Sequence, residues 1–281
     1  MGTTTPNFGL YIPADGETGW GTGKVDTNWT IIDSNLTNSL PRNYLAGCQL
    51  TNNAGSPNTK IDVAAGQAQD VNNAGAMTLA NITKDISATW VVGNAGGLAP
   101  SLTLTASTWY HVFVIKRTDT NVVDAYFDSS SVAVNIPAPY TLFRRVGSVL
   151  TDAGTLLLAF IQDGDYFQWK VPLLETTSAT PGTNAVTQTL ANAPLGVLNR
   201  VVLNVANAAA GFLAYLSDLA TTDAAPSSTV APLASVGTSA AAVSAGQVIV
   251  RTNASAQIRT RNGANARLFI ATVGWYDTRG K

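Results

Sequence analysis

Glutamate and lysine are very scarce in this chain: its 281 residues contain 2 Glu and 6 Lys against 35 Thr and 22 Asn. This exchange removes the straight-chain residues that favour α-helix and keeps β-branched and turn-forming residues. Charged residues make up 12% of the chain, roughly half of the ~25% that is typical of soluble domains. The composition therefore disfavours a mainly helical protein. It equally disfavours a disordered one, which needs high net charge and few apolar residues.

The low charge also bears on assembly, because surfaces covered by other proteins are depleted in Lys, Glu and Asp. The formal net charge is −1, but it is unevenly spread. Residues 1–176 carry 9 basic and 14 acidic side chains, whereas residues 177–281 carry 7 basic and 3 acidic ones. The sequence thus predicts two bodies with different surfaces, parts of which other chains cover.

The first 43 residues differ from the rest. Residues 1–23 are rich in Gly and Pro, with isolated aromatic side chains, and are typical of an extended segment. An apolar stripe of helical spacing follows: Val25, Trp29, Ile32 and Leu36. This spacing predicts a helix of about 15 residues that Pro41 ends. Because such a short helix is marginal alone, we expect it to dock, either on another protein or on its own chain.

From residue 44 onward the pattern becomes β. Two hairpins are predicted, one from residues 110–116 and 122–127 and one from residues 144–150 and 156–161. Further strands are expected at 166–171, 199–205, 211–216, 247–251, 257–261 and 267–273. Strands at near-regular spacing with polar turns indicate antiparallel sandwiches or barrels.

The predicted fold is therefore mainly β. A short N-terminal helical anchor occupies residues 1–43, a jelly-roll-like antiparallel β-sandwich occupies residues 44–175, and a second such β domain occupies residues 176–281. The boundary lies at a Thr-rich, Pro- and Gly-containing run at 175–182, where the charge also changes sign.

Few side chains here are suited to catalysis. His111, the single histidine, lies inside an apolar run, and we expect it to make a structural hydrogen bond; Cys48, the single cysteine, reads as a small buried residue. Zinc sites need several His or Cys ligands, and this chain has one of each. The acidic clusters within 119–128 and 163–165 occupy turn or strand-edge positions, where Asp bonds the backbone. We expect no enzyme and no cofactor, and we assign no metal ligands; the alternative to a turn at residues 163–165 is weak calcium binding, although the further ligands of a full calcium loop are missing.

A modest basic patch stands out near the end of the chain. Arg259 and Arg261 alternate on one predicted strand, and Trp275 and Tyr276 follow soon after. These four residues are the candidates for contact with a receptor, and the most specific form of this hypothesis is that the receptor is an acidic glycan. The alternative is that the arginines lie on a solvated strand face. Nucleic acid binding normally needs a stronger positive charge, so we do not expect it.

Targeting signals are not evident in the sequence. No window reaches about 18 uninterrupted apolar residues, the length of a membrane-spanning helix. Residues 1–6 lack the basic and apolar regions of a signal peptide. We expect synthesis in the cytoplasm and no membrane insertion.

The N-terminal run has a recognisable order: Leu10-Tyr11-Ile12-Pro13, Gly16, Gly19-Trp20-Gly21, Val25, Asn28-Trp29 and Ile32-Asp33. It resembles the N-terminus of tail fibres of tailed bacteriophages. Stretches at 44–47, 61–66, 108–112 and 144–148 also resemble phage tail-fibre or virion structural domains. The resemblance covers about residues 3–172 and does not extend to residues 176–281.

The resemblance implies a non-enzymatic virion protein, a short tail fibre or receptor-binding protein that mediates adsorption to the host surface. It implies a homotrimer, located in the phage tail and bound to other tail or baseplate proteins, with residues 176–281 as the tip that meets a host glycan or protein. The residues expected to attach it to the virion are Tyr11, Trp20, Trp29, Ile32 and Leu36. Two alternatives stay open: a head fibre, decoration, neck or baseplate component, and a glycan-degrading tail tip.

Overall fold

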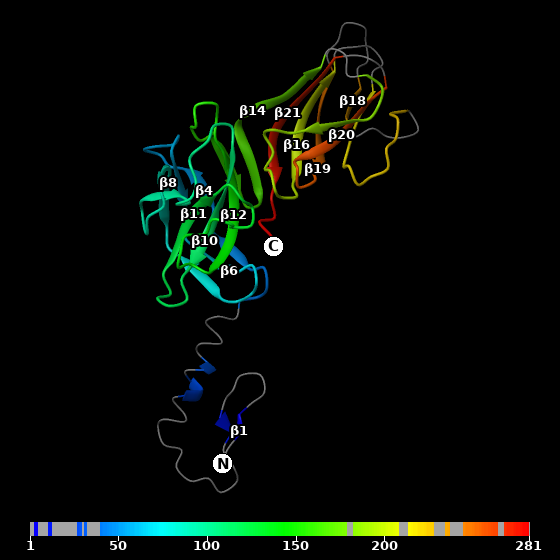
Figure 1. Ribbon diagram of the computed structural model, residues 1–281. Helices are drawn as coiled ribbons and strands as arrows, with labels where there is room; N and C mark the ends of the chain where they lie inside the picture. Colours follow the sequence, from blue (N-terminus) through cyan, green and yellow to red (C-terminus); the bar gives the residue numbers. More distant parts are fainter. Residues whose placement is uncertain are drawn as a thin grey trace.

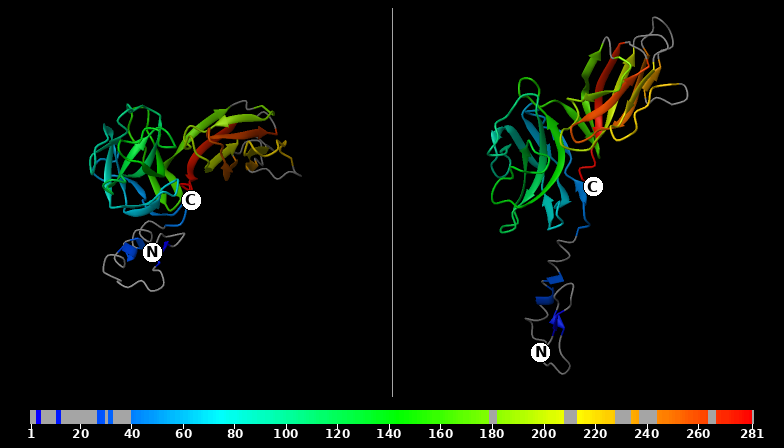
Figure 2. Two further views of the ribbon diagram at one scale, coloured as in Figure 1. Left: turned by 60° about the horizontal axis from the view of Figure 1, so that its bottom comes forward. Right: turned by 45° about the vertical axis from the view of Figure 1, so that its right-hand side comes forward.

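A computed structural model (Figure 1) describes residues 3–4, 11–12, 27–29, 31–32, 40–178, 182–207, 213–227, 234–236, 244–263 and 267–280. Within this part of the chain the protein is mainly β, as the composition predicts. Figure 1 shows two β bodies, one coloured blue to green and the other light green to red. They meet along one junction, to which the chain returns after its last strand in both views of Figure 2.

The first body is built on a curved, nearly closed, barrel-like sheet of seven strands. Their order across the sheet is β12 (Leu142–Leu150), β10 (Trp109–Lys116), β11 (Val123–Asp128), β9 (Gly96–Leu98), β8 (Ile82–Thr89), β5 (Lys60–Val63) and β4 (Leu50–Asn52). β9 pairs in parallel with β8 and β11, and the other pairs are antiparallel. A second sheet contains β3 (Leu45–Gly47), β6 (Gly66–Gln69) and β7 (Ala76–Leu79).

Strand β10 shows why this body holds together. Seven of its eight residues are buried, and successive residues of a strand point to opposite faces. Tyr110, Val112 and Val114 therefore face the main core of the molecule. Phe113 and Ile115 face a second, smaller core. A continuous apolar run is typical of a strand that is covered on both faces.

The second body contains two antiparallel sheets. The five-stranded sheet has the order β13 (Phe160–Asp163), β14 (Tyr166–Ser178), β21 (Leu268–Tyr276), β16 (Arg200–Asn207) and β19 (Ser244–Arg251). The four-stranded sheet has the order β15 (Val186–Thr189), β20 (Gln257–Asn262), β17 (Leu213–Ser217) and β18 (Ala234–Val236). Inward residues of both sheets, such as Leu203, Leu216 and Ile258, share the main core.

The two bodies are joined by aromatic packing. Trp109 on β10, Trp169 on β14 and Trp275 on β21 form a cluster with ring centroids 4.9–5.8 Å apart. The indole N–H of Trp109 donates to the main-chain oxygen of Ala191 at 3.0 Å. These buried rings belong to one continuous core that passes from one body into the other.

Two side-chain amides also bridge β4 and β13, the edge strands of the two larger sheets. The main-chain N–H of Leu50 donates to Gln162 Oε1 at 2.6 Å. The N–H of Phe160 donates to Asn52 Oδ1 at 3.1 Å. The amides thus satisfy backbone groups at sheet edges, where partners are otherwise missing.

The predicted hairpins have different outcomes. The hairpin at 110–127 is confirmed, because β10 pairs with β11 in an antiparallel register. The hairpin at 144–161 is reduced to a single bridge between Thr151 and Leu157. β12 instead pairs with β10, and β13 pairs with β14. Strand β14 also runs without a break through the predicted boundary at 175/176.

The predicted N-terminal helix is not shown. Of residues 1–43, β1 (Thr3–Thr4) pairs with β2 (Tyr11–Ile12), and residues 27–29 and 31–32 are helical. The remainder of the expected helix lies outside the described residues. Among the residues that are described, no helix has the length and apolar character needed to cross a membrane.

Candidate functional site

The arginines expected to contact a receptor lie beside partners from their own chain. On β20, Arg259 donates to the main-chain oxygens of Thr221 at 2.7 Å and Leu219 at 3.2 Å. Arg261 forms an ion pair with Asp223. The loop that follows β17 therefore supplies acceptors to both guanidinium groups, although the buried Nε of Arg261 has no acceptor among the described residues. Less positive charge remains for a ligand than the sequence suggested.

The two aromatic candidates, Trp275 and Tyr276, differ in burial. Trp275 has no exposed surface and stacks on Phe167, with centroids 5.3 Å apart and ring planes 5° apart. It serves the core, which corrects its expected place on a receptor-binding surface. Tyr276 is 43% exposed and packs on Tyr166 at 4.7 Å. Neighbours on a strand point to opposite faces, so only one of this pair reaches the surface.

The residues expected to attach the chain to a virion are described only in part. The side chain of Asn28 accepts a hydrogen bond from the N–H of Tyr11 at 2.7 Å and donates to its oxygen at 3.2 Å. Trp29 is 64% exposed, and Ile32 is half-buried. Trp20 and Leu36 lie outside the described residues.

His111 is buried and shares a 2.9 Å hydrogen bond between its Nδ1 and Ser148 Oγ. Burial, and then the positive charge of Arg145, lower its pKa from 6.5 to about 4, so the ring is neutral at pH 7. Cys48 is also buried, and burial raises the pKa of its thiol to about 11. Within the described ranges, no group of three or more His, Cys, Asp or Glu is arranged to hold a metal ion.

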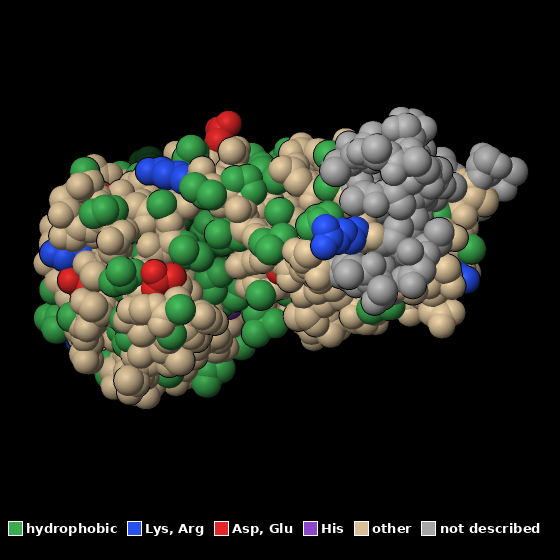
Figure 3. All heavy atoms as spheres, turned by 90° about the horizontal axis from the view of Figure 1, so that it is seen from above, with side chains coloured by type: hydrophobic (Ala, Val, Ile, Leu, Met, Phe, Trp, Pro, Cys, Tyr) green, Lys and Arg blue, Asp and Glu red, His purple; other side chains and the backbone are tan. Residues whose placement is uncertain are grey.

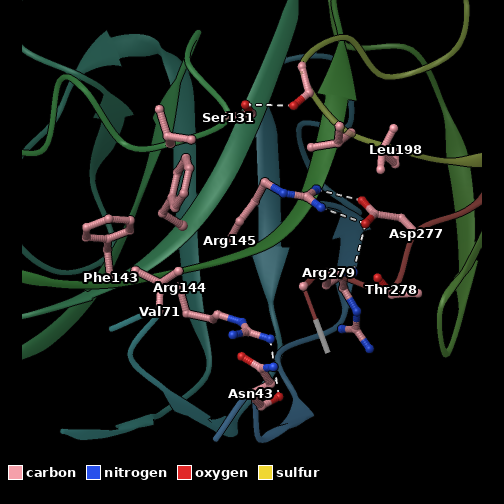
Figure 4. A pocket seen from close by; sticks show the side chains of 15 residues that line it. Asn43, Val71, Ser131, Phe143, Arg144, Arg145, Leu198, Asp277, Thr278 and Arg279 are labelled. Atoms are coloured by element: carbon pink, nitrogen blue, oxygen red, sulfur yellow. Dashed lines mark hydrogen bonds and ion pairs between the residues drawn. The ribbon is translucent and has the colours of Figure 1, made fainter. Parts of the chain in front are cut away.

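A cavity of about 450 Å³ lies at the junction of the two bodies (Figure 4). Four segments form most of its wall: β12, the loop after β11, the loop before β16 and the chain that follows β21. They contribute Arg144 and Arg145, Ser131 and Val132, Gly196 to Leu198, and Asp277 to Gly280, respectively. We call it the junction cavity.

The position of β12 explains how two adjacent arginines reach one cavity. β12 is the edge strand of its sheet, and its register with β10 shifts by one residue next to Arg145. Such a bulge changes the direction of nearby side chains. Figure 4 shows the guanidinium group of Arg145 extending toward Asp277 and that of Arg144 extending toward Asn43.

Two of these arginines have carboxylate partners. Arg145 forms a two-point ion pair with Asp277, with both N···O distances at 2.6 Å. Arg279 binds Asp165 through Nη2 at 2.8 Å and Nε at 3.1 Å. Asp277 also accepts a hydrogen bond from the N–H of Arg279 at 2.8 Å. This network fixes the wall of the cavity on the side of the second body.

Arg144 differs from both. It is only 2% exposed, and within the described part of the chain no carboxylate lies within ion-pair distance of it. Its Nη2 donates to the oxygen of Asn43 at 3.2 Å, and its buried Nε has no acceptor there. Burial, followed by the charges of Arg145 and Arg279, lowers its pKa.

The sequence does not predict the junction cavity. Its pattern places Arg144 and Arg145 at the start of a strand and gives no sign of a role for Asp277 and Arg279. The available signal was a pair of adjacent cations in an otherwise apolar strand of a charge-poor chain. Buried cations of this kind need partners, and the partner of Arg145, Asp277, comes from the other end of the chain.

A second notable surface is the outward side of the five-stranded sheet. Two rows of paired residues cross β14, β21, β16 and β19 without a charged side chain: Leu174, Ala271, Asn204 and Gln247, and then Thr177, Phe269, Ala206 and Ala245. Leu174 is 62% exposed, and Ile249, two residues after Gln247 on β19, is 51% exposed. We call these residues the outer face. A sheet side that meets water is usually polar.

Figure 3 shows a related feature on one face of the molecule: hydrophobic and neutral side chains prevail over both bodies, and charged side chains are few. A comparison of the chain with models of known protein families, with curated proteins and with solved structures found no match.

Proposed function

We propose that this chain is a non-enzymatic structural protein of a bacteriophage virion, a short tail fibre or receptor-binding protein that mediates adsorption to the host. In this proposal the two bodies are jelly-roll-like β-sandwiches and the protein is a homotrimer. Residues 1–43 attach it to other tail or baseplate proteins. The second body faces the host surface.

The observation that carries the proposal is the uncharged outer face. Burying an apolar side chain is worth about 1.5–3 kcal/mol, and the largely exposed Leu174 and Ile249 leave that gain unused in a single chain. Depletion of Lys, Glu and Asp is what distinguishes surfaces that other chains cover. A second copy of the chain covers the outer face in this proposal, and this explains part of the low content of charged residues.

The N-terminal segment supports the attachment role. Its aromatic pattern carries the resemblance to tail fibres, and the 64% exposed indole of Trp29 offers a large apolar group to a neighbour. Tryptophan is enriched among residues that anchor protein interfaces. Trp29 is accordingly the first residue that we assign to contact with the virion.

One observation favours the second candidate, a head fibre, decoration, neck or baseplate component. Arg259 and Arg261 already have partners in the loop of their own chain that follows β17, and Trp275 is buried. Three of the four expected receptor contacts are therefore poorly placed for recognition. A packing role needs none of them.

Purified particles of the phage whose genome encodes the chain test the proposal. Its peptides should be found in the particles by mass spectrometry, and added full-length chain should compete with the phage for adsorption to susceptible cells. Presence in the particle without competition would favour the packing role. Absence of the chain from the particle would overturn both candidate functions, the receptor-binding role and the packing role.

A further inference from the structure

Arg144 is buried without a nearby countercharge among the described residues, and this arrangement calls for an explanation. The carboxylate that acts on it electrostatically is Asp70, which lies beyond ion-pair distance. Asp70 already accepts hydrogen bonds from the main-chain N–H groups of Phe143 at 2.9 Å, Asn72 at 2.9 Å and Ala74 at 3.3 Å. Its oxygens are therefore occupied by the backbone.

Burying a charged group is costly unless it is paired and hydrogen-bonded. Arg145 and Arg279 meet this condition through Asp277 and Asp165. Arg144 has one hydrogen bond to a neutral oxygen and a buried Nε without an acceptor in the described structure. A guanidinium group presents its donors in a fork that fits a carboxylate at two points. The missing partner of Arg144 is thus an anion of that geometry.

The rest of the junction cavity indicates what the anion is attached to. Its volume of about 450 Å³ is far larger than a carboxylate needs and lies in the ordinary range of small-molecule sites. Val132 and Leu198 give it apolar walls, whereas Ser131, Asn43 and Thr278 offer hydroxyl and amide groups. A sugar ring has this combination, because it presents apolar C–H faces and hydroxyl groups at its rim.

We propose that the junction cavity binds the carboxylate of an acidic sugar residue of the hexuronic acid class, with Arg144 as its main contact. The sugar ring lies against the apolar wall that includes Val132 and Leu198. This inference rests on the proposed adsorption function for its biological meaning. It moves the acidic-glycan contact from Arg259 and Arg261 to a cation whose donors are not taken up by a carboxylate of the described chain.

Titration of the full-length protein with glucuronate tests the proposal by calorimetry or NMR, with glucose, acetate and inorganic phosphate as comparison ligands. We expect one saturable site per chain for glucuronate and at least tenfold weaker binding of glucose, which lacks the carboxylate. Acetate should also bind at least tenfold more weakly, because it lacks the ring. Equal binding of phosphate, or no saturation with glucuronate, would overturn the assignment.

Arg144→Gln should weaken glucuronate binding at least tenfold, because glutamine keeps a donor for Asn43 but loses the charge. Arg267→Gln is the matched control, since it removes an exposed arginine that does not line the cavity, and it should bind as the wild type does. Unchanged binding in Arg144→Gln would contradict the proposal.

A second pair of variants avoids any change to the buried network. Leu198 is 64% exposed and lines the cavity, so Leu198→Asp and Leu198→Asn should both fold, and they differ essentially in one charge. The aspartate should weaken glucuronate binding about threefold or more relative to the asparagine by repulsion. Equal affinities in the two variants would refute an anion site here, whatever happens to Arg144→Gln.

The outcomes separate this inference from the proposed function. A chain that is found in the virion and competes for adsorption, but does not bind glucuronate, would leave the virion role standing and remove the site. A chain that binds glucuronate through Arg144 but is absent from the particle would keep the site and remove the virion role.

Discussion

Arg145 and Asp277 lie 132 residues apart in the chain, yet they form a two-point ion pair with both N···O distances at 2.6 Å. The arginine belongs to β12 of the first body, and the aspartate directly follows β21 of the second. Arg145 also donates to Ser148 Oγ at 3.2 Å. The pair thus ties the last segment of the chain to the first body and forms one wall of the junction cavity.

Removal of one member of this pair should be costly. The side chain of Asp277 is 1% exposed and that of Arg145 is 11% exposed, so Asp277→Asn would leave a poorly solvated cation without its partner. We expect the free energy of unfolding to fall by about 3 kcal/mol, measured by urea denaturation. The exposed pair of Arg117 and Asp119 is the control, and Asp119→Asn should change stability by less than about 1 kcal/mol. Equal effects of the two variants would show that the junction does not depend on this contact.

The first body contains a second buried cation that has a carboxylate partner. Lys84 is completely buried and lies 2.8 Å from Asp124. It also donates to the oxygens of Val91 at 2.7 Å and Gly93 at 2.8 Å. Lys84→Met should lower the free energy of unfolding by about 3–5 kcal/mol, because it leaves the carboxylate unpaired. Lys60→Met is the control, since the side chain of Lys60 is 39% exposed. A loss below 1 kcal/mol in Lys84→Met would contradict the account.

The pH dependence of stability should carry a contribution from His111. Burial lowers its pKa to about 4 in the folded chain, against 6.5 when unfolded. Below pH 6.5 the unfolded state therefore binds more protons, and stability falls as the pH is lowered from 6.5 to 4. The loss approaches about 3 kcal/mol at pH 4. His111→Gln should remove this slope in urea denaturation measured between pH 4 and pH 7. An unchanged slope would show that His111 is not the titrating group.

The outer face predicts the effect of a single introduced charge. Leu174→Asp should dissociate the assembled protein and leave the fold of each chain intact, because 62% of Leu174 is exposed in the single chain. Val92→Asp is the matched control in the first body, where Val92 is 52% exposed. Size-exclusion chromatography should separate the two variants. An unchanged elution of Leu174→Asp would remove the outer face from any interface.

The predictable part of this fold is local. The hairpin of β10 and β11 follows from two β-rich runs around a polar turn. The strands at 166–171, 247–251 and 257–261 fall within β14, β19 and β20 because their composition favours strands wherever they pair. The pairing of β12 and β13 is not local, since each has its partner elsewhere, and spacing alone does not reveal it.

The candidate site also combines local features that the sequence predicts with contacts between distant segments that it does not predict. Sequence pattern placed Arg259 and Arg261 on one face of a strand, but it did not show that the loop after β17 lies beside them. It did not identify the interior side of β21 either, and therefore treated the buried Trp275 as a surface residue. The junction cavity is formed by residues near 144 and near 277, which only the tertiary fold brings together.

The most direct test of the account is the mass of the purified full-length protein in solution, measured by light scattering over a range of concentrations. Assembly through the outer face as a homotrimer predicts three times the chain mass of 29.2 kDa. A mass of 29.2 kDa at every concentration would contradict the claim that the missing charge reflects surfaces covered by other copies of the chain.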